Sequence, residues 1–312
     1  MGSAGDRWHG QRRGPVAWAA PGIGDAVYAQ PVLRMATSAR VLDGKDLDEA
    51  LALLERDPVA DVFVASRIQQ AGLSELRLNA QVWGFGERGR LESLCYSGAN
   101  LVPVQAGPAA VRAFADQARR QGRRCSSIVG TSASVRPLWQ LLSPHWGAAR
   151  EVRDNQPLLA LDGPPAVAPD PAVRRVRPAE IEVLLPACVA MFTEEVGVSP
   201  TAGGGGALYR ARVQELIAAG RAYARIEDGR VLFKAEVGAA TRTVCQVQGV
   251  WVHPSLRGRG LSAAGTAAVV ELARAEVAPV VCLYVNDFNT AARRCYARVG
   301  FGAVGLFTSV LF

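Results

Sequence analysis

The sequence predicts an α/β protein with a mixed sheet, built from two units of similar rhythm. Three observations favour this class. The 312 residues are enough for two domains of ordinary size. Of these residues, 49% are hydrophobic, which allows sizeable cores. Strand-like runs alternate with helix-like runs along both units, and turn residues separate them.

We expect the first unit to span residues 39–162, after a disordered N-terminal extension, 1–38, that is rich in Gly, Ala, Arg and Pro. Met35 leads directly into folded-looking sequence and could be the true start. The predicted elements are a strand (39–42), a helix (46–58), strands within 80–104, a helix (107–123), a strand (125–130), a helix (134–146) and a strand (157–161).

A Pro-rich linker, 163–172, leads to a second unit, 173–312, with the order βαα-βββ-αβαβ. Its hairpin turns at Asp228-Gly229, a strong turn signal. The predicted elements are a strand (173–178), helices (179–197 and 208–220), the hairpin (221–238), a strand (242–252), a helix (261–277), a strand (279–287), a helix (289–300) and a strand (305–312). The similar rhythm of the first unit predicts a divergent repeat.

Composition excludes several classes of function. The formal net charge is +7, but every basic residue except Lys45 and Lys234 is arginine, which indicates coding bias more than a nucleic-acid surface. No apolar run of 18 residues or secretory core is present, so we expect no membrane association and a soluble cytoplasmic protein. The chain has six cysteines, none of them in a CxxC pair, and three histidines. These residues offer few candidate ligands for a metal site, so we expect no metal. The oligomeric state is unknown from sequence.

The stretch HPSLRGRGLS, residues 253–262, lies between an apolar strand and a helix, which is typical of a phosphate-binding turn. Gly258 and Gly260 let backbone N–H groups approach an anion, and the helix adds its positive dipole end. GxxxxGK[ST] is absent, and Ala263 breaks the GxGxxG pattern. Taken alone, the stretch could equally be a surface turn with solvated arginines.

Three linked motifs between Val247 and Phe301 resemble the GNAT superfamily of acyl-CoA-dependent N-acetyltransferases. The family's acyl-CoA loop reads R/Q-x-x-G-x-G/A, and residues 257–262 match it except at the last position, Ser262. VWVHPSLRG matches the lead-in V-x-P-x-x-R-G. The ending N-x-x-A-x-x-x-Y-x-x-x-GF is matched by Asn289, Ala292, Tyr296, Gly300 and Phe301.

The resemblance covers residues 173–312 and implies a GNAT fold there, with a degenerate GNAT-like copy in the first unit. More narrowly, FKAEVG, CQVQGVWV and LYVNDFN resemble actinobacterial GNAT proteins with an extra N-terminal domain of uncharacterised role. The first unit lacks the acyl-CoA loop motif, so we expect it to complete the acceptor cleft or to support the fold.

The resemblance implies acetyl-CoA as co-substrate. Backbone amides of the loop would bind its pyrophosphate; the loop residues are Arg257, Gly258, Arg259, Gly260, Leu261 and Ser262. Main-chain groups of Val250, Trp251 and Val252 would pair with the pantetheine arm where the strand splays from its neighbour. Gly249 either marks a bulge or allows close packing. Asn289 either binds the cofactor arm or caps the following helix.

For catalysis, the resemblance places Tyr296 as the general acid that protonates the CoA sulfur, with a core tyrosine as the alternative. The family's usual Glu before the loop is Gln246 here. Glu236, on the adjoining strand, is the preferred substitute as base, and a solvated strand residue is the alternative. Glu194 and Glu195 are second choices or could bind a cationic substrate, while Gln246 and Gln248 would orient substrate or water.

We therefore expect an enzyme that transfers an acetyl group from acetyl-CoA to a primary amine. The alternative is a module that senses acyl-CoA without turnover, which Gln246 favours. Nucleic-acid binding by the arginine-rich surface is a third and weaker reading. The sequence does not identify the acceptor.

Overall fold

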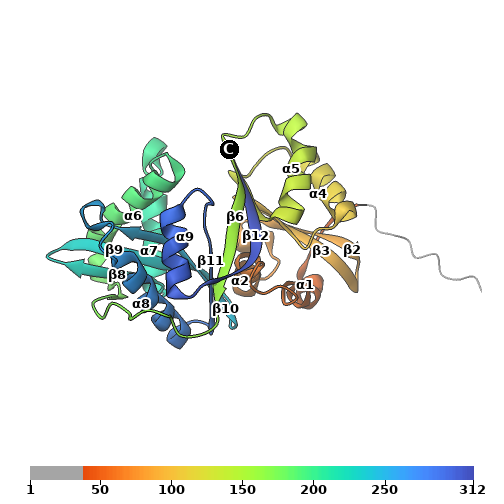
Figure 1. Ribbon diagram of the computed structural model, residues 1–312. Coiled ribbons are helices and arrows are strands. Elements are labelled where there is room, and N and C mark those ends of the chain that lie inside the picture. The colour runs from red at the N-terminus through yellow and green to blue at the C-terminus, as the bar shows by residue number, and fades with distance from the viewer. Residues whose placement is uncertain (1–37) are drawn as a thin grey trace, which may run out of the picture. The chain divides into compact units, whose positions relative to one another are not determined.

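A twelve-stranded mixed sheet runs through residues 38–312, the part of the chain that the computed structural model describes (Figure 1). The strands lie in the order β1-β2-β3-β4-β5-β12-β6-β11-β10-β9-β8-β7. This confirms the predicted fold class of a mixed sheet with helices. The predicted N-terminal extension, apart from Ser38, and the question of Met35 lie outside the described residues.

The N-terminal half contains the elements up to β6. They are β1 (Arg40–Val41), η1 (Gly44–Asp46), α1 (Leu47–Leu54), α2 (Val62–Ala71), α3 (Glu75–Leu78), β2 (Gln81–Glu87), β3 (Arg90–Ser97), β4 (Asn100–Val104), α4 (Pro108–Gln121), β5 (Ser127–Thr131), α5 (Ser132–Trp146) and β6 (Glu151–Leu161). The sequence analysis missed α2 and α3. The missed helix α2 packs between the two halves, and its Ser66 Oγ accepts a hydrogen bond from the Ala240 N–H at 3.2 Å.

The C-terminal half repeats the same order of elements. They are β7 (Arg174–Arg175), η2 (Pro178–Glu180), α6 (Ile181–Val196), η3 (Ala202–Gly204), α7 (Gly206–Ala218), β8 (Ala222–Glu227), β9 (Arg230–Ala240), β10 (Val244–Val252), η4 (Pro254–Leu256), α8 (Leu261–Glu276), β11 (Val280–Tyr284), α9 (Thr290–Val299) and β12 (Gly302–Leu311). The predicted order βαα-βββ-αβαβ is confirmed here. The hairpin also turns where predicted, with Asp228 and Gly229 both at positive φ, 48° and 70°.

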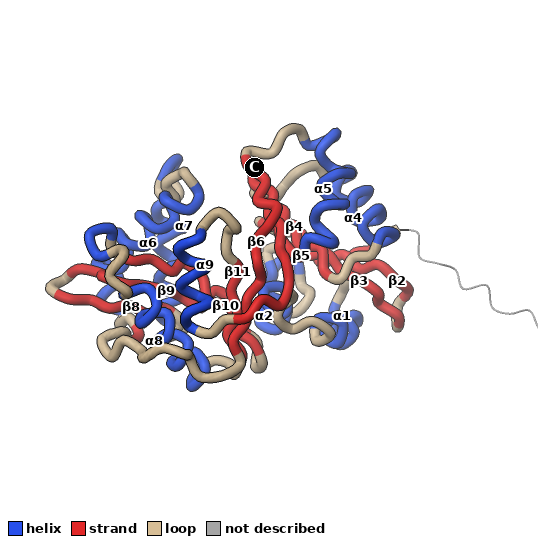
Figure 2. Tube along the Cα trace, in the orientation of Figure 1, coloured by secondary structure: helices blue, strands red, loops and turns tan. Residues whose placement is uncertain are grey.

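The two halves exchange their last strands. β6 pairs with β11, Leu158 opposite Tyr284, and thereby extends the sheet of the C-terminal half. β12 pairs with β5, Val310 opposite Ile128, and extends the sheet of the N-terminal half. β6 and β12 pair with each other along most of their length, as Figure 2 shows at the centre of the molecule. Residues 38–312 therefore belong to one compact unit rather than to two separable bodies.

Helices cover both faces of the sheet in each half, as amphipathic elements require. In the C-terminal half, α8 and α9 bury one face, with Phe233 and Val269 in that core, and α6 and α7 bury the other, with Leu184 and Trp251. In the N-terminal half, α4 and α5 cover one face and α1 and α2 the other. No helix of residues 38–312 is long and apolar enough to cross a membrane.

Polar side chains fill the junction between β6 and β12. Gln156 is 3% exposed, and its Nε2 donates to Asn286 Oδ1 at 2.8 Å. Its Oε1 accepts from Ser309 Oγ at 2.6 Å. Because each buried polar atom named here has a partner, this network fixes the relative register of the strands instead of weakening them.

One carboxyl group is buried where α2 meets the rest of the fold. Asp61 is 5% exposed and accepts a hydrogen bond from Gln105 Nε2 at 2.8 Å. Burial raises the pKa of Asp61 to about 7. Since the folded pKa exceeds the unfolded one, the stability contributed by this group is complete below about pH 4 and is lost as the pH rises through about 7.

We expect wild-type protein to lose about 2–3 kcal/mol of unfolding free energy between pH 5 and pH 8 relative to Asp61→Asn, which keeps the shape but not the charge. Urea unfolding of both proteins at the two pH values measures this difference. Asp162→Asn, at an exposed position, should follow wild type. Parallel pH dependence of wild type and Asp61→Asn would contradict the assignment.

Candidate functional site

An opening separates β10 from β11 in the C-terminal half. The two parallel strands pair only from Val244 opposite Val280 to Gln246 opposite Cys282. β10 then continues to Val252 while remaining paired with β9 on its other side, with Val252 opposite Phe233. The β10 edge at Val250–Val252 therefore has no strand partner on the β11 side within residues 38–312. This is the splay that the sequence resemblance implied.

A β-bulge lies at the opening, at Gly249. β10 advances three residues from Gln248 to Trp251 while β9 advances only two, from Glu236 to Lys234. Gly249 has a φ of 60°, and a Cβ there would lie 3.0 Å from Lys234 Nζ and 3.3 Å from Glu236 Cδ. The bulge and the close packing, which the sequence analysis treated as alternatives, thus occur together.

The loop after β10 presents a row of backbone donors. Gly258 and Gly260 have φ values of 75° and 86°, which favour glycine. Within the described part of the chain, the N–H groups of residues 258–262 donate to no acceptor. These five groups lead into the N-terminus of α8, where the helix dipole adds partial positive charge. The loop is therefore a preformed anion site.

The two loop arginines differ in their surroundings. The Arg257 guanidinium donates to the Val252 carbonyl at 3.1 Å and to Glu194 Oε2 at 2.7 Å, so it braces the loop against β10 and α6. Arg259 is exposed and has no ion-pair partner among residues 38–312. Arg259 is thus the loop cation that is available to a bound anion.

The side chains of two predicted cofactor-binding residues make structural contacts within the protein. Asn289 Oδ1 accepts from the Ala292 N–H at 3.1 Å and caps α9, the alternative that the sequence analysis left open. Ser262 Oγ accepts from Cys295 Sγ at 3.2 Å, so its side chain packs against α9. Its backbone N–H remains available, which is why Ser in place of Gly or Ala leaves the loop intact.

A buried charged cluster lies beneath the bulge. Lys234 is 1% exposed, and its Nζ contacts Glu236 Oε2 at 3.1 Å. The other oxygen of Glu236 accepts from Gln248 Nε2 at 2.9 Å. Burial lowers the pKa of Lys234, but Glu236 and Cys188 outweigh it and hold that pKa above its ordinary value. Both carboxylate oxygens of Glu236 therefore have partners, which weakens its assignment as general base.

The sequence analysis gave Lys234 no role. One signal was present, because Lys234 is one of only two lysines in a chain with strong preference for arginine and lies within the apolar run VLFKAEV. An ammonium there needs a buried carboxylate, and Glu236 follows two residues later on the same face of β9.

The two adjacent glutamates at the end of α6 serve different contacts. Glu194 accepts from Trp251 Nε1 at 3.2 Å and from Arg257, so it supports the loop. Glu195 has no ion-pair partner among the described residues, and its side chain is open to solvent. Desolvation by the surrounding protein nevertheless raises the pKa of Glu195 above its ordinary value, although the charges of Arg153 and Lys234 oppose the rise.

The charge of Glu195 acts on three tyrosines. Burial is the largest cause of the raised pKa of Tyr209, Tyr284 and Tyr296, and the charge of Glu195 adds to it in each case. The pKa of Tyr284 is raised to about 12. Glu195 and Tyr296 belong to helices on opposite faces of the sheet, α6 and α9 (Figure 1). Their coupling through the sheet is consistent with the opening between β10 and β11.

Strand alternation places further polar side chains on the face of the sheet that α6 covers. Gln246 pairs with Cys282 and Gln248 with Glu236, and all of them lie on the α6 face of the sheet. Gln246 is 6% exposed and has no hydrogen-bond partner among residues 38–312. The structure therefore gathers Glu195, Gln246, Gln248 and Glu236 on one side of the opening and directs Glu194 to the loop.

The corresponding strands of the N-terminal half, β4 and β5, also pair over a short stretch only, with Asn100 opposite Ser127 and Leu101 opposite Ile128. A Cβ at Gly130 of β5 would lie 3.3 Å from the Pro103 carbonyl of β4, so these strands stay close even though Pro103 cannot donate a ladder bond. Only residues 105–107 connect β4 to α4, and the Ala106 N–H donates to Ser134 Oγ at 3.2 Å. Pro108, which begins α4, has no N–H, so the row of donors is interrupted at two positions there.

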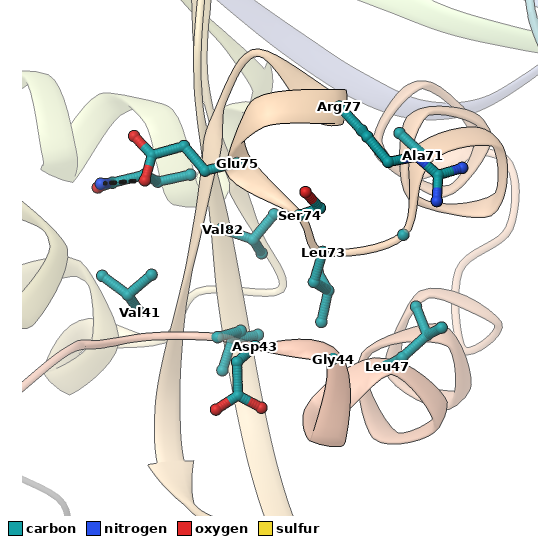
Figure 3. A pocket seen from close by; sticks show the side chains of 13 residues that line it. Val41, Asp43, Gly44, Leu47, Ala71, Leu73, Ser74, Glu75, Arg77 and Val82 are labelled. Carbon is teal, nitrogen blue, oxygen red and sulfur yellow. Dashed lines mark hydrogen bonds between the residues drawn. The ribbon is translucent and has the colours of Figure 1, made fainter.

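A separate hollow of about 480 Å³ lies in the N-terminal half, between β1, η1 and the turn from α2 to α3. Figure 3 shows the apolar side chains of Val41, Leu47, Leu73 and Val82 around it. None of its lining residues belongs to the loop or to the β10–β11 opening. We therefore place the candidate site at the opening.

Comparison with protein families gives two matches. Residues 201–301 match the acetyltransferase (GNAT) family. Residues 80–184 match a domain of unknown function, DUF4081, which extends from β2 through β6 into α6. Comparison with curated proteins gave no significant match.

Solved structures share the two-half fold. A GCN5-related N-acetyltransferase from Sphaerobacter thermophilus is 19% identical, with a TM-score of 0.58 over 88% of this chain and 95% of that chain. A GNAT-family acetyltransferase from Colwellia psychrerythraea is 13% identical, with a TM-score of 0.51 over 88% of this chain and 99% of that chain. A Drosophila protein is 16% identical, with a TM-score of 0.59 over 88% and 98% of the two chains.

At these identities the solved structures show the fold alone, while the family match covers α7, the opening, the donor loop and α9. The two findings agree with the geometry of the β10–β11 opening. The C-terminal half of this chain is a GNAT acetyltransferase domain, preceded by a region that matches the domain of unknown function.

Proposed function

We propose that the protein transfers an acetyl group from acetyl-CoA to a primary amine. The observation that carries this proposal is the opening between β10 and β11, which lies directly before the five free N–H groups of residues 258–262. A pyrophosphate at the loop and an arm paired with the β10 edge would deliver a thioester to the opening. All six cysteines are free, which supports a reducing, cytoplasmic compartment.

The chemistry requires a neutral amine, attack on the thioester carbonyl carbon and departure of the CoA thiolate. The new bond joins the amine nitrogen to that carbon, the carbon–sulfur bond breaks, and the sulfur takes a proton. Tyr296 remains our choice for the proton donor, because its raised pKa keeps the hydroxyl protonated. The amine proton passes to a carboxylate or through water.

Glu195 is the better candidate than Glu236 for accepting that proton. Glu236 is engaged by Lys234 and Gln248. Glu195 is open to solvent, its charge acts on Tyr284 and Tyr296, and its raised pKa brings the carboxylate closer to useful basicity. The position of Glu195 also suits binding of a protonated amine before its deprotonation.

A second function, acyl-CoA sensing without turnover, is favoured by one observation. Gln246 occupies the strand position where the family usually has Glu, and the neighbouring Glu236 is held in an ion pair. Release of free thiol from acetyl-CoA in the presence of an amine panel separates the two functions. Tight binding without thiol release on any amine would support the sensor.

We expect Gly260→Val to weaken acetyl-CoA binding by about tenfold or more, because a β-branched residue opposes the positive φ that aims the loop donors. Isothermal titration calorimetry measures the dissociation constant. Gly44→Ala, at a glycine with open space and no positive φ, is the control. Equal affinity of Gly260→Val and wild type would exclude the loop as the anion site.

We expect Tyr296→Phe to lower kcat by about 10–100-fold while acetyl-CoA affinity is retained, because only the proton donor is removed. The ring keeps its edge-to-face contact with Phe301, 5.9 Å between centroids. Tyr223→Phe is the matched control, since its buried hydroxyl has no hydrogen-bond partner among the described residues. An unchanged kcat in Tyr296→Phe would refute the assignment.

We expect Glu195→Gln to remove the acidic limb of the pH–rate profile. The base acts when deprotonated, so wild-type activity should fall as the pH drops through a pKa above the ordinary value for Glu. Glu236→Gln should instead cost stability, about 3–5 kcal/mol, because it leaves Lys234 buried without a counter-ion. If only Glu236→Gln loses the acidic limb, Glu236 is the base.

A further inference from the structure

The N-terminal half reaches the candidate site through its last strand. β6 pairs with β11 only from Leu158 to Leu161, and its residues before Leu158 extend beyond the end of β11. Along this extension β6 is supported on its other side by β12, down to Glu151 opposite Leu311. The start of β6 therefore lies next to the last turn of α6, the helix that carries Glu194 and Glu195.

Two arginines of this segment bind the end of α6. Arg153 Nη2 donates to the Glu195 carbonyl at 2.7 Å, and Arg150 Nη1 donates to the Val196 carbonyl at 3.1 Å. The last carbonyls of a helix lack intrahelical partners and carry partial negative charge, so cations are favourable there. Gly197, at a φ of 78°, ends the helix directly after them.

Arg153 is itself held in place. Its side chain is 9% exposed, and its guanidinium binds Glu151 through both carboxylate oxygens, at 2.9 and 3.0 Å. A bidentate pair of this kind fixes the plane of the guanidinium. Nη2 uses one N–H for Glu151, and its other N–H donates to the Glu195 carbonyl.

The main-chain position of Glu195 decides where its carboxylate points. Consecutive residues of a helix project about 100° apart. The side chains of Glu194 and Glu195 can therefore point to the loop and to the opening at the same time only when α6 has one particular rotation about its axis. Glu194 is bound by Trp251 and Arg257, but Glu195 has no side-chain partner of its own in residues 38–312. Among residues 38–312, the side-chain hydrogen bond made to Glu195 is the one from Arg153 to its carbonyl.

We propose that Arg153 is a positioning residue through which the N-terminal half holds the Glu195 carboxylate toward the acceptor side of the opening. The acceptor site is then incomplete without β6, whereas the acyl-CoA loop belongs entirely to the C-terminal half. This inference rests on the proposed function for its kinetic consequence, but the contact itself can be tested without turnover.

The experiment compares wild type, Arg153→Met and Arg210→Met in the full-length chain. Met keeps an apolar stem but donates no hydrogen bonds. Arg210 pairs with Glu182 in the first turn of α6 and is the matched control at the opposite end of the same helix. Hydrogen exchange of peptides covering residues 192–198, acetyl-CoA affinity and steady-state kinetics with an amine panel are measured for each protein.

Arg153→Met should exchange faster at 192–198 and lose about tenfold or more in kcat, since a misplaced group costs rate, while its acetyl-CoA dissociation constant stays within about twofold of wild type. Arg210→Met should match wild type in all three. If circular dichroism shows that Arg153→Met does not fold, Arg153→Lys replaces it, because an ammonium keeps the charge but cannot form the planar bidentate pair with Glu151 that aims the third hydrogen bond.

Unchanged exchange at 192–198 in the Arg153 variant, or an equal effect in Arg210→Met, would overturn the inference. An Arg153 variant that exchanges faster at 192–198 but keeps the wild-type kcat would also overturn the inference. If wild type releases no thiol with any amine, the proposed function fails, and the exchange comparison still decides whether Arg153 holds the end of α6.

Discussion

The pairing of β6 with β12 is the interaction on which the rest of the structure depends. Each strand completes the sheet of the half that did not supply it, so neither half has a finished sheet alone. The satisfied polar contacts of Gln156 with Ser309 and Asn286 fix the register. Removal of one half would expose a long unpaired edge on the other, a template for aggregation. The same exchange carries the start of β6 to the end of α6.

A second constraint acts at the opening itself. The bulge at Gly249 lets β10 leave β11 while it stays paired with β9, and both its positive φ and the nearby Lys234 disfavour a side chain there. A buried ammonium costs free energy unless a carboxylate compensates it, and Glu236 is that carboxylate. Glu236, the base that the sequence favoured, is therefore needed to neutralise Lys234. The carboxylate left open to solvent is Glu195, at a helix end.

Local signals predicted much of this fold and part of the site. The Asp228-Gly229 turn, the β10–α8 loop and the order of elements depend on residues close in sequence, and the structure has them where expected. The start of β6, with Glu151, Arg153 and Asp154, is too polar to predict as a strand, and only its pairing with β12, about 150 residues away, makes it one. The contact of Arg153 with α6 has the same origin. No periodicity in either segment could indicate it.

The two halves repeat one order of elements but differ at the position that matters for acyl-CoA. Eight residues, 253–260, connect β10 to α8 and leave a row of free N–H groups, whereas three residues, 105–107, connect β4 to α4. The helix α4 begins at Pro108, which has no N–H to offer, and Ala106 gives its own N–H to Ser134. β4 and β5 also stay close at Pro103 and Gly130, beyond their last paired residues. We therefore infer that the N-terminal half supports the C-terminal half and contributes to the candidate site through β6.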